Sequence, residues 1–405
     1  MSEATWAPVP DGSPFGPAVL PYGCFSLARE PRRVGVRIGD HVLVLAGLAG
    51  DGLLGAFPAA PAAFAAPGLD VRMASGPDAW RATRERVAVL LADGRERTRV
   101  EPHLHPLGDA ELHLPFAVAD YADFYASLHH ATNLGRLLRP GEEPLPPNWR
   151  HLPVGYHGRA GTVVVSGTDI VRPRGQYLPA GAPAPEFGPS RRLDFELELG
   201  FVIGAPSRLG SPVAVADALE HVFGVVLLND WSARDLQAWE YRPLGPFLGK
   251  SFATSIGAWV TPLAALEPLR VPAPAQEPAP LEYLREQPWA LDVDLEVELN
   301  GVVVASTSAR NLYWSPAQMI AHLTANGASL RTGDLLGSGT ISGPERGERG
   351  SLVELSWGGG EPIELPGGQT RVFLEDGDAV VLSGTALAEV AGRVLPAPTP
   401  SGATP

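Results

Sequence analysis

The chain has 405 residues, of which 45% are hydrophobic and 19% charged, and its formal net charge is −14 at pH 7. This composition is typical of a globular protein with a sizeable core, and the acidic balance argues against nucleic acid or an anionic membrane as a partner. A single cysteine, Cys24, excludes a disulfide framework, and 31 basic residues include only one lysine, Lys250. Because no signal peptide or membrane span is recognised, we expect a cytoplasmic protein.

The first part of the chain is predicted to form a small domain. Segments 34–37 and 41–48 flank Ile38-Gly39-Asp40, which is the pattern of a β-hairpin. Segment 78–91 has apolar residues at helical spacing. A soft boundary near Pro115 divides the chain into residues 1–114 and 115–405.

The larger part is predicted to be mainly β with some α. Helices are expected over 120–138 and 315–325, the second with Ser315 as N-cap and Pro316 at its first position. Asn300-Gly301 is a strong hairpin signal. Strands are expected over 162–165, 193–203, 222–228, around Val260, and over 291–299, 302–306, 352–357, 371–374 and 379–382.

Acidic residues alternate with apolar ones in the segment Leu193–Leu199. On a strand, Asp194, Glu196 and Glu198 share one face, and neighbouring carboxylates on that face lie about 6–7 Å apart. No Lys or Arg stands between them, so the carboxylates repel each other. A hard divalent cation would relieve this repulsion, whereas an ordinary solvated strand face is the alternative.

Two further acidic positions are candidates for a site. Asp230 follows the apolar strand 222–228, and because Ser232 is a better cap for the helix expected from about 233, Asp230 is available for another role. On the helix predicted over 120–138, Asp123 and His130 are seven residues apart and lie on nearly the same face. The alternatives are a capping aspartate and a structural histidine.

Cationic and polar side chains follow Asp230 in the sequence. Arg234, Gln237 and Tyr241 are spaced to share one face of a helix and are all hydrogen-bond donors. Lys250 comes after segment 243–249, which has no polar side chain, so its usual interpretation as a solvated surface residue is weakened.

Six runs resemble the fumarylacetoacetate hydrolase family: 120–135, 152–159, 229–241, 245–252, 338–343 and 352–357. The most specific are Asn-Asp-Trp-Ser-Ala-Arg-Asp from Asn229 and Gly-Pro-Phe-Leu-Gly-Lys-Ser-Phe from Gly245. The resemblance implies an N-terminal SH3-like barrel, a C-terminal β-sandwich roll and a homodimer. It also implies metal-dependent hydrolysis of a carbon–carbon bond in a small diketo acid, 4-fumarylacetoacetate, the last step of tyrosine and phenylalanine breakdown.

The resemblance also implies roles for individual residues. His130 matches the general base, oriented by Glu354; His129 precedes it, but adjacent helical residues point in different directions. Charge stabilisation is implied for Arg234, Gln237 and Lys250, and substrate contact for Tyr125, Arg139, Tyr156, Gln237, Tyr241 and Thr340. Ligation of Ca²⁺ or Mg²⁺ is implied for Asp123, Glu196, Glu198 and Asp230, with a second ion near Asp230, Lys250 and Thr254.

The chemistry explains this combination of residues. A 1,3-diketone chelates a hard cation, which polarises the attacked carbonyl, while a histidine backed by a carboxylate deprotonates water. A decarboxylase, a tautomerase or an acylpyruvate hydrolase of the same superfamily is one alternative. A metal-stabilised β-sandwich binding protein without catalysis is another, although binding alone needs no His130–Glu354 pair.

Overall fold

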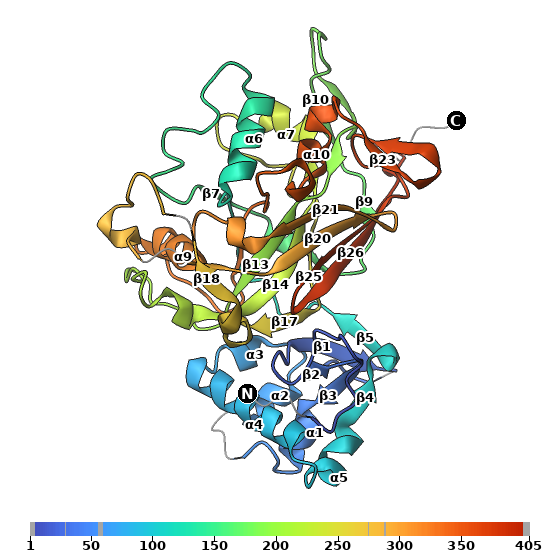
Figure 1. Ribbon diagram of the computed structural model, residues 1–405, viewed down its shortest axis with the longest axis vertical. Coiled ribbons are helices and arrows are strands. Elements are labelled where there is room, and N and C mark those ends of the chain that lie inside the picture. Colours follow the sequence, from blue (N-terminus) through green and yellow to red (C-terminus); the bar gives the residue numbers. More distant parts are fainter. Residues whose placement is uncertain (1–4, 29, 56–59, 274, 287–288, 400–405) are drawn as a thin grey trace.

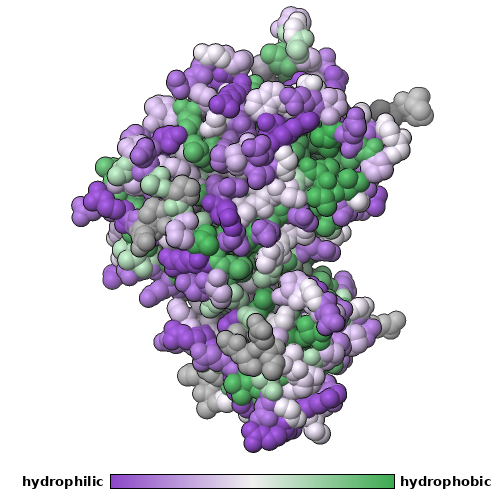
Figure 2. All heavy atoms as spheres, viewed as in Figure 1, coloured by the Kyte–Doolittle hydropathy of each residue, from purple (hydrophilic) through white to green (hydrophobic). Residues whose placement is uncertain are grey.

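The computed structural model describes residues 5–28, 30–55, 60–273, 275–286 and 289–399. It has a smaller N-terminal part, at the bottom of Figure 1, below a larger part rich in strands. The face in Figure 2 is largely hydrophilic, with a hydrophobic area on the right of the larger part. None of the described helices is both long enough and apolar enough to cross a membrane.

The N-terminal part is a sheet covered by helices. Its strands β1 (Tyr22–Leu27), β2 (Arg33–Ile38), β3 (His41–Val44), β4 (Leu104–Pro106) and β5 (Ala110–His113) are ordered β4-β3-β2-β1-β5. The helices are α1 (Leu45–Gly50), α2 (Ala60–Ala65), α3 (Asp70–Met73), α4 (Pro77–Ala92) and α5 (Arg97–Val100). The predicted hairpin and the helix near 78–91 are confirmed. The SH3-like barrel is not, because no pairing among the described strands joins β4 to β5.

Cys24 lies on β1 and is 1% exposed. Burial is the main cause that raises the pKa of its thiol to about 11, and Sγ donates to the carbonyl of Pro67 at 2.8 Å. Because the thiolate is the reactive form, we expect negligible labelling by iodoacetamide at pH 8 in the native protein and full labelling in denaturant. Rapid stoichiometric labelling of the native protein, followed by mass spectrometry, would contradict this placement.

The sheet of the N-terminal part continues into the larger part, since β1 also pairs with β17 (Trp259–Pro262). The order runs on as β17-β14-β13-β22-β6-β7; β16 also pairs with β14, and β8 pairs with β16. These strands are β6 (Tyr121–Phe124), β7 (Gly155–His157), β8 (Val163–Val165), β13 (Leu197–Ile203), β14 (Val222–Asp230), β16 (Thr254–Ile256) and β22 (Leu335–Gly337).

A second sheet, ordered β21-β20-β25-β26-β9, lies against the first (Figure 1). It contains β9 (Ile170–Val171), β20 (Asp294–Leu299), β21 (Val302–Ser308), β25 (Ala379–Gly384) and β26 (Leu387–Leu395). Apolar side chains of both sheets, such as Leu199 and Leu227 in one and Val297 and Leu382 in the other, are fully buried in one core. Burial of this kind is the main stabilising contribution to a two-layer β domain.

Short elements surround these sheets. The paired strands are β10 (Arg174–Tyr177) with β11 (Glu186–Pro189), β12 (Leu193–Asp194) with β15 (Ser232–Ala233), β18 (Arg270–Pro272) with β19 (Trp289–Leu291), and β23 (Ile363–Leu365) with β24 (Gln369–Arg371). The helices are α6 (Leu128–Leu138), α7 (Arg234–Glu240), α8 (Leu263–Leu266), α9 (Pro316–Thr324) and α10 (Leu352–Leu355). The hairpin at Asn300-Gly301 and the cap of α9 by Ser315 are confirmed. The fold is thus mainly β with some α, as predicted.

Three predicted elements are wrong. Residues 120–138 are not one helix: Tyr121–Phe124 form β6, which pairs with β22 and β7, and only Leu128–Leu138 are helical. Residues 352–357 begin with the helix α10 rather than a strand. Residues 371–374 are not a strand: β24 ends at Arg371, and Leu374 makes only an isolated bridge with Leu193. Segment 193–203 is a strand for most of its length, as predicted, but it is divided into β12 and β13. Distant pairing partners decide all three segments, and local periodicity does not reveal them.

Candidate active site

A cavity of about 340 Å³ lies where β6, α6, β13, α7 and the loop after α7 meet. Most of the predicted site residues line it, from five separate stretches of the chain: Asp123, Tyr125, His130, Arg139, Tyr156, Glu196, Glu198, Arg234, Gln237, Tyr241, Lys250 and Thr340. Three others do not line it: Glu354 is hydrogen-bonded to His130 and Asp230 to Lys250, and Thr254 is hydrogen-bonded to Asp230. The fold therefore brings the whole predicted set together.

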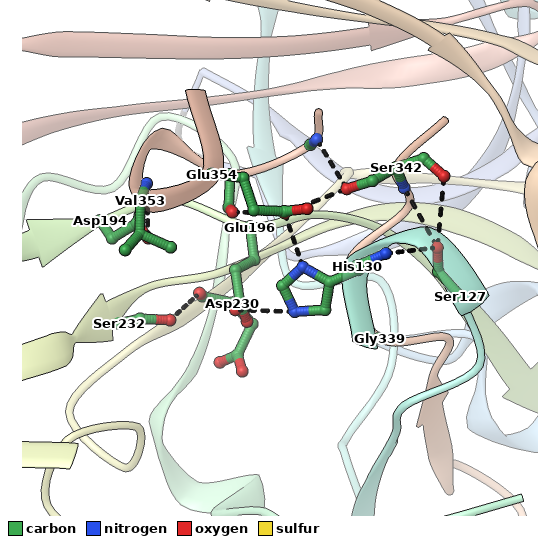
Figure 3. Close-up of polar contacts among 12 residues, drawn as sticks. Ser127, His130, Asp194, Glu196, Asp230, Ser232, Gly339, Ser342, Val353 and Glu354 are labelled. Atoms are coloured by element: carbon green, nitrogen blue, oxygen red, sulfur yellow. Dashed lines mark hydrogen bonds and ion pairs between the residues drawn. The ribbon is translucent and has the colours of Figure 1, made fainter. Parts of the chain in front are cut away.

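His130 and Glu354 form a buried pair at the wall of the cavity (Figure 3). Ser127 is the N-cap of α6, and its Oγ accepts a hydrogen bond from the backbone N–H of His130. His130 therefore lies in the first turn of the helix. Nδ1 of His130 lies 2.6 Å from Oε2 of Glu354, on α10. This contact fixes the ring and leaves Nε2 facing the cavity side, 3.8 Å from Glu196.

Glu354 is held in the ionised form by several donors. Asn133 Nδ2 donates to Oε1 at 2.9 Å, while Ser351 and Ser342 donate to Oε2 at 2.6 and 3.0 Å. Burial opposes ionisation, but His130 and these hydrogen bonds outweigh it and lower the pKa of Glu354. An ionised Glu354 places the proton of neutral His130 on Nδ1, which leaves Nε2 as a proton acceptor.

Three buried carboxylates form an acidic cluster beside this pair. Oxygens of Asp123, Glu198 and Asp230 lie within 4.8 Å of one another. They come from β6, β13 and β14, and Asp123 reaches the cluster because β6 pairs in parallel with β22, which in turn pairs with β13. Burial, and then mutual repulsion, raises the pKa of Asp123 and Glu198. The cluster is therefore electrostatically costly without a cation.

The donor set of the cluster suits a hard divalent cation. Oδ1 of Asp123 and Oε1 of Glu198 are buried and have no hydrogen-bond partner in the described part of the chain. Buried polar atoms are rarely left unpaired, and Ca²⁺ and Mg²⁺ prefer oxygen ligands. The residues present thus fit a hard divalent metal ion.

Glu196, the fourth predicted metal ligand, is engaged by cations. Arg234 Nη2 donates to Oε1 at 2.5 Å, and Lys250 Nζ is paired with Oε2. Burial would raise the pKa of Glu196, but Arg234 and Lys250 lower it below its ordinary range. Glu196 is thus ionised, and it contacts the cations Arg234 and Lys250 and lies close to His130.

Lys250 is buried, with 7% of its surface exposed, so the solvated alternative is wrong. Nζ donates to Asp230 Oδ2 at 2.6 Å as well as to Glu196. Burial lowers the pKa of Lys250, but Asp230 and Glu196 outweigh this effect and raise it. The ammonium is therefore charged, and its three donors cannot ligate a metal; any role of Lys250 as a ligand would fall to its main-chain oxygen.

Helix α7 presents Arg234 and Gln237 to the cavity, as their spacing predicted, and Tyr241 follows at its C-cap. Arg234 Nη1 donates to Gln237 Oε1 at 3.1 Å. The predicted capping by Ser232 is wrong: Ala233 is the N-cap, and Ser232 Oγ instead donates to the carbonyl of Asp230 at 3.0 Å. The strand β15 places Ser232 before the helix begins.

The other predicted residues occupy separate walls. Tyr125 packs edge-on against the His130 ring, with centroids 5.3 Å apart. Tyr156 donates to Asp230 Oδ2 at 3.1 Å, and Thr254 donates to Asp230 Oδ1 at 3.3 Å. Oγ1 of Thr340 is buried without a partner among the described residues and lines the cavity. Arg139 also lines the cavity, where its Nη2 donates to the carbonyl of Pro144 at 2.6 Å.

Sequence reasoning missed the residues that support this site. They are Ser127, Asn133, Ser342 and Ser351 around the His130–Glu354 pair, and the aliphatic wall formed by Leu134, Leu138, Val154 and Leu244. Ser127 carried a usable signal, because serine is a preferred N-cap and would have started the helix at Leu128. Ser351 lies only three residues before Glu354, whereas Asn133 meets Glu354 from a distant part of the chain.

Comparisons with known proteins agree with this arrangement. Residues 18–115 match the family model "Fumarylacetoacetase N-terminal", and residues 120–395 match "Fumarylacetoacetate (FAA) hydrolase C-terminal". Fumarylacetoacetase of Homo sapiens is 45% identical over 418 residues, covering 98% of this chain and 100% of the relative. That of Caenorhabditis elegans is 46% identical over 413 residues, covering 96% of this chain and 98% of the relative.

Solved structures share the fold at low sequence identity. Fumarylacetoacetate hydrolase from Exiguobacterium antarcticum has a TM-score of 0.55 at 19% identity and covers 93% of this chain and 99% of its own. Maleylpyruvate hydrolase from Sphingobium has a TM-score of 0.52 at 18% identity, covering 93% and 100%. The two family models and the relatives of similar length show that the chain belongs to the fumarylacetoacetase family.

Proposed function

We propose that this enzyme hydrolyses a carbon–carbon bond of 4-fumarylacetoacetate to give fumarate and acetoacetate, the last step of tyrosine and phenylalanine breakdown in the cytoplasm. The observation that carries the proposal is the buried His130–Glu354 pair, 2.6 Å apart, at a cavity that is also lined by acids and by the cations Arg234 and Lys250. The relatives of similar length, each named fumarylacetoacetase, support the choice of substrate.

His130 is the proposed general base. Nε2 takes a proton from a water molecule as the hydroxide adds to the ketone carbon of the fumaryl group, and Glu354 stabilises the resulting imidazolium. The carbon–carbon bond then breaks, and its electron pair leaves as the enolate of acetoacetate. The proton held on His130 returns to the enolate carbon, so the step balances as the addition of one water.

Arg234, Gln237 and Lys250 are the proposed donors to developing negative charge. They are fixed before the substrate arrives, because Arg234 and Lys250 are both tied to Glu196. Preorganised donors of this kind commonly contribute ~10²–10³ in rate. Tyr125, Arg139, Tyr156, Tyr241 and Thr340 are the proposed contacts to the rest of the substrate.

Asp123, Glu198 and Asp230, with Glu196, are the proposed ligands of Ca²⁺ or Mg²⁺. Such an ion, when bound, supplies Lewis-acid polarisation of a diketone oxygen. A second ion is proposed near Asp230, Lys250 and Thr254. The unpaired buried oxygens of Asp123 and Glu198 support the first site.

Replacing Glu198 with glutamine should abolish the stabilisation that Ca²⁺ gives the protein. A ligand at 100 times its Kd stabilises the native state by about 2.7 kcal/mol, which raises the Tm of the wild type. In Glu198→Gln the increase in Tm on adding Ca²⁺ should disappear, whereas Glu296→Gln, an exposed acid on β20, should retain it. An unchanged Ca²⁺ affinity of Glu198→Gln by calorimetry would refute the ligand assignment.

A comparison of substrates tests the proposed activity. The purified protein with Ca²⁺ or Mg²⁺ is given fumarylacetoacetate and, separately, acylpyruvates, and the loss of near-ultraviolet absorbance is followed. The proposal requires a higher kcat/KM for fumarylacetoacetate. Cleavage of acylpyruvates with fumarylacetoacetate left intact would assign the chain to another activity of the superfamily.

We further propose that the enzyme is a homodimer. Each chain is proposed to have two domains, residues 1–114 and 115–405. Exposed apolar side chains around α7 support a partner surface: Trp239, Leu244, Phe247 and Leu248 are 42, 96, 69 and 46% exposed. The N-terminal family match ends at residue 115 and the C-terminal match begins at residue 120, which supports the domain boundary.

A further inference from the structure

Asp194 is a fully buried carboxylate to which the proposed mechanism gives no role. It lies on β12, paired with Ser232 of β15, and 0% of its surface is exposed. It does not line the cavity, and its oxygens are not part of the acidic cluster. A buried ionised group requires partners to offset its desolvation, so its contacts indicate what it does.

The contacts of Asp194 reach both sides of the proposed catalytic machinery. Oδ2 accepts Nε of Arg234 at 2.7 Å, which leaves the other nitrogens of the guanidinium for Glu196 and Gln237. Oδ1 accepts the amide of Leu352 at 2.8 Å, and Oδ2 accepts that of Val353 at 3.3 Å. These amides open α10, the single turn that carries Glu354 (Figure 3).

All three contacts are donors to Asp194, which makes a carboxylate necessary. An asparagine has the same shape but offers one acceptor oxygen and one donor NH₂ group. With its oxygen in the place of Oδ2, asparagine keeps Arg234 and the longer contact to Val353 but turns its NH₂ group against the amide of Leu352. Turned the other way, it keeps Leu352 and turns its NH₂ group against Arg234 and Val353, so asparagine cannot keep all three contacts.

We propose that Asp194 is a positioning residue that fixes Arg234 and the Glu354 turn relative to each other, so that charge stabilisation and base orientation are aligned on one substrate. The inference rests on the proposed hydrolase function. Asp194 touches no reacting atom; it acts through Arg234 and through the backbone of α10. Charge stabilisation by Arg234 and orientation of the base by Glu354 both act in the transition state. Loss of the Asp194 carboxylate should therefore lower kcat more than it changes KM.

The test compares Asp194→Asn with a matched control, Asp378→Asn. Asp378 is also a buried aspartate, 2% exposed, that accepts an arginine, Arg371, and a backbone amide, that of Glu375, but it does not line the cavity. Both variants should lose several degrees of Tm. With fumarylacetoacetate as substrate, Asp194→Asn should lose about 30-fold or more in kcat with KM within about threefold, and Asp378→Asn should keep both within about twofold.

A second readout separates positioning from general destabilisation. In a Glu354→Gln background, where base orientation is already impaired, Asp194→Asn should cost much less in kcat than it does in the wild type, because the two changes act on one unit. Equal losses in both backgrounds, or a kcat of Asp194→Asn within threefold of the wild type, would overturn the inference. If Asp194→Asn does not fold, Asp194→Ser is measured in the same way. If neither folds while Asp378→Asn does, Asp194 serves the fold and the inference fails. An inactive wild type would instead refute the proposed function.

Discussion

Replacing His130 with alanine is expected to lower kcat by about 10²–10⁴-fold while the substrate still binds. The imidazole is the only histidine side chain among the described residues that line the cavity, and its Nδ1 is held by Glu354 at 2.6 Å. Removing it takes away the proton acceptor for water but leaves Arg234, Gln237 and Lys250 in place to bind the substrate. Steady-state kinetics together with a binding measurement on the variant check this result.

The neighbouring His129 provides the control. It shares the helix and the residue type, but it does not line the cavity. His129→Ala should therefore keep kcat within about twofold of the wild type. A His130→Ala variant with normal turnover, or a His129→Ala variant with the larger loss, would refute the assignment of the base.

The exchange of Lys250 for arginine is expected to lower kcat/KM by about 10²-fold, although it conserves the charge. Lys250 Nζ fits between Glu196 and Asp230 in a buried position. A planar guanidinium is larger and directs its donors in a fixed fork, so it would displace one of these carboxylates. Inserting extra volume into a packed site commonly costs about 1–3 kcal/mol in addition.

An exchange between arginine and lysine at an exposed position is the control for Lys250→Arg. Arg81 on α4 has a side chain that is 66% exposed, and Arg81→Lys should leave both Tm and kcat/KM unchanged. Near-normal turnover of Lys250→Arg would mean that the single lysine of the chain is a product of its composition rather than a requirement of the site.

The sequence predicted the members of the site better than the elements that carry them. Asp123 was placed on a helix with His130, yet it lies on β6 and meets the other acids because β6 pairs with β22. The pairing partner is some two hundred residues away, so no local pattern could reveal it. The buried strand β14 and the hairpin at Asn300-Gly301 were predictable, because a long apolar run and a turn signal are local features.

The supporting contacts were less predictable than the reacting groups. Asp194 was grouped with the acids of a presumed metal site, but β12 turns it towards Arg234 and the opening amides of α10. The same contact explains why residues 352–355 form a helical turn: Asp194 accepts amides that the alternating sequence would otherwise direct into a strand ladder. Roles of this kind depend on three segments meeting in space.

The most direct test of the account is product analysis with the wild-type protein. Fumarylacetoacetate is incubated with the metal-loaded enzyme, and the products are quantified by nuclear magnetic resonance alongside a reaction with His130→Ala. Fumarate and acetoacetate are expected in equal amounts from the wild type, and His130→Ala should form them at only a small fraction of the wild-type rate. Unchanged substrate, a decarboxylated or isomerised product, or equal rates for the two proteins would contradict hydrolysis with His130 as the base.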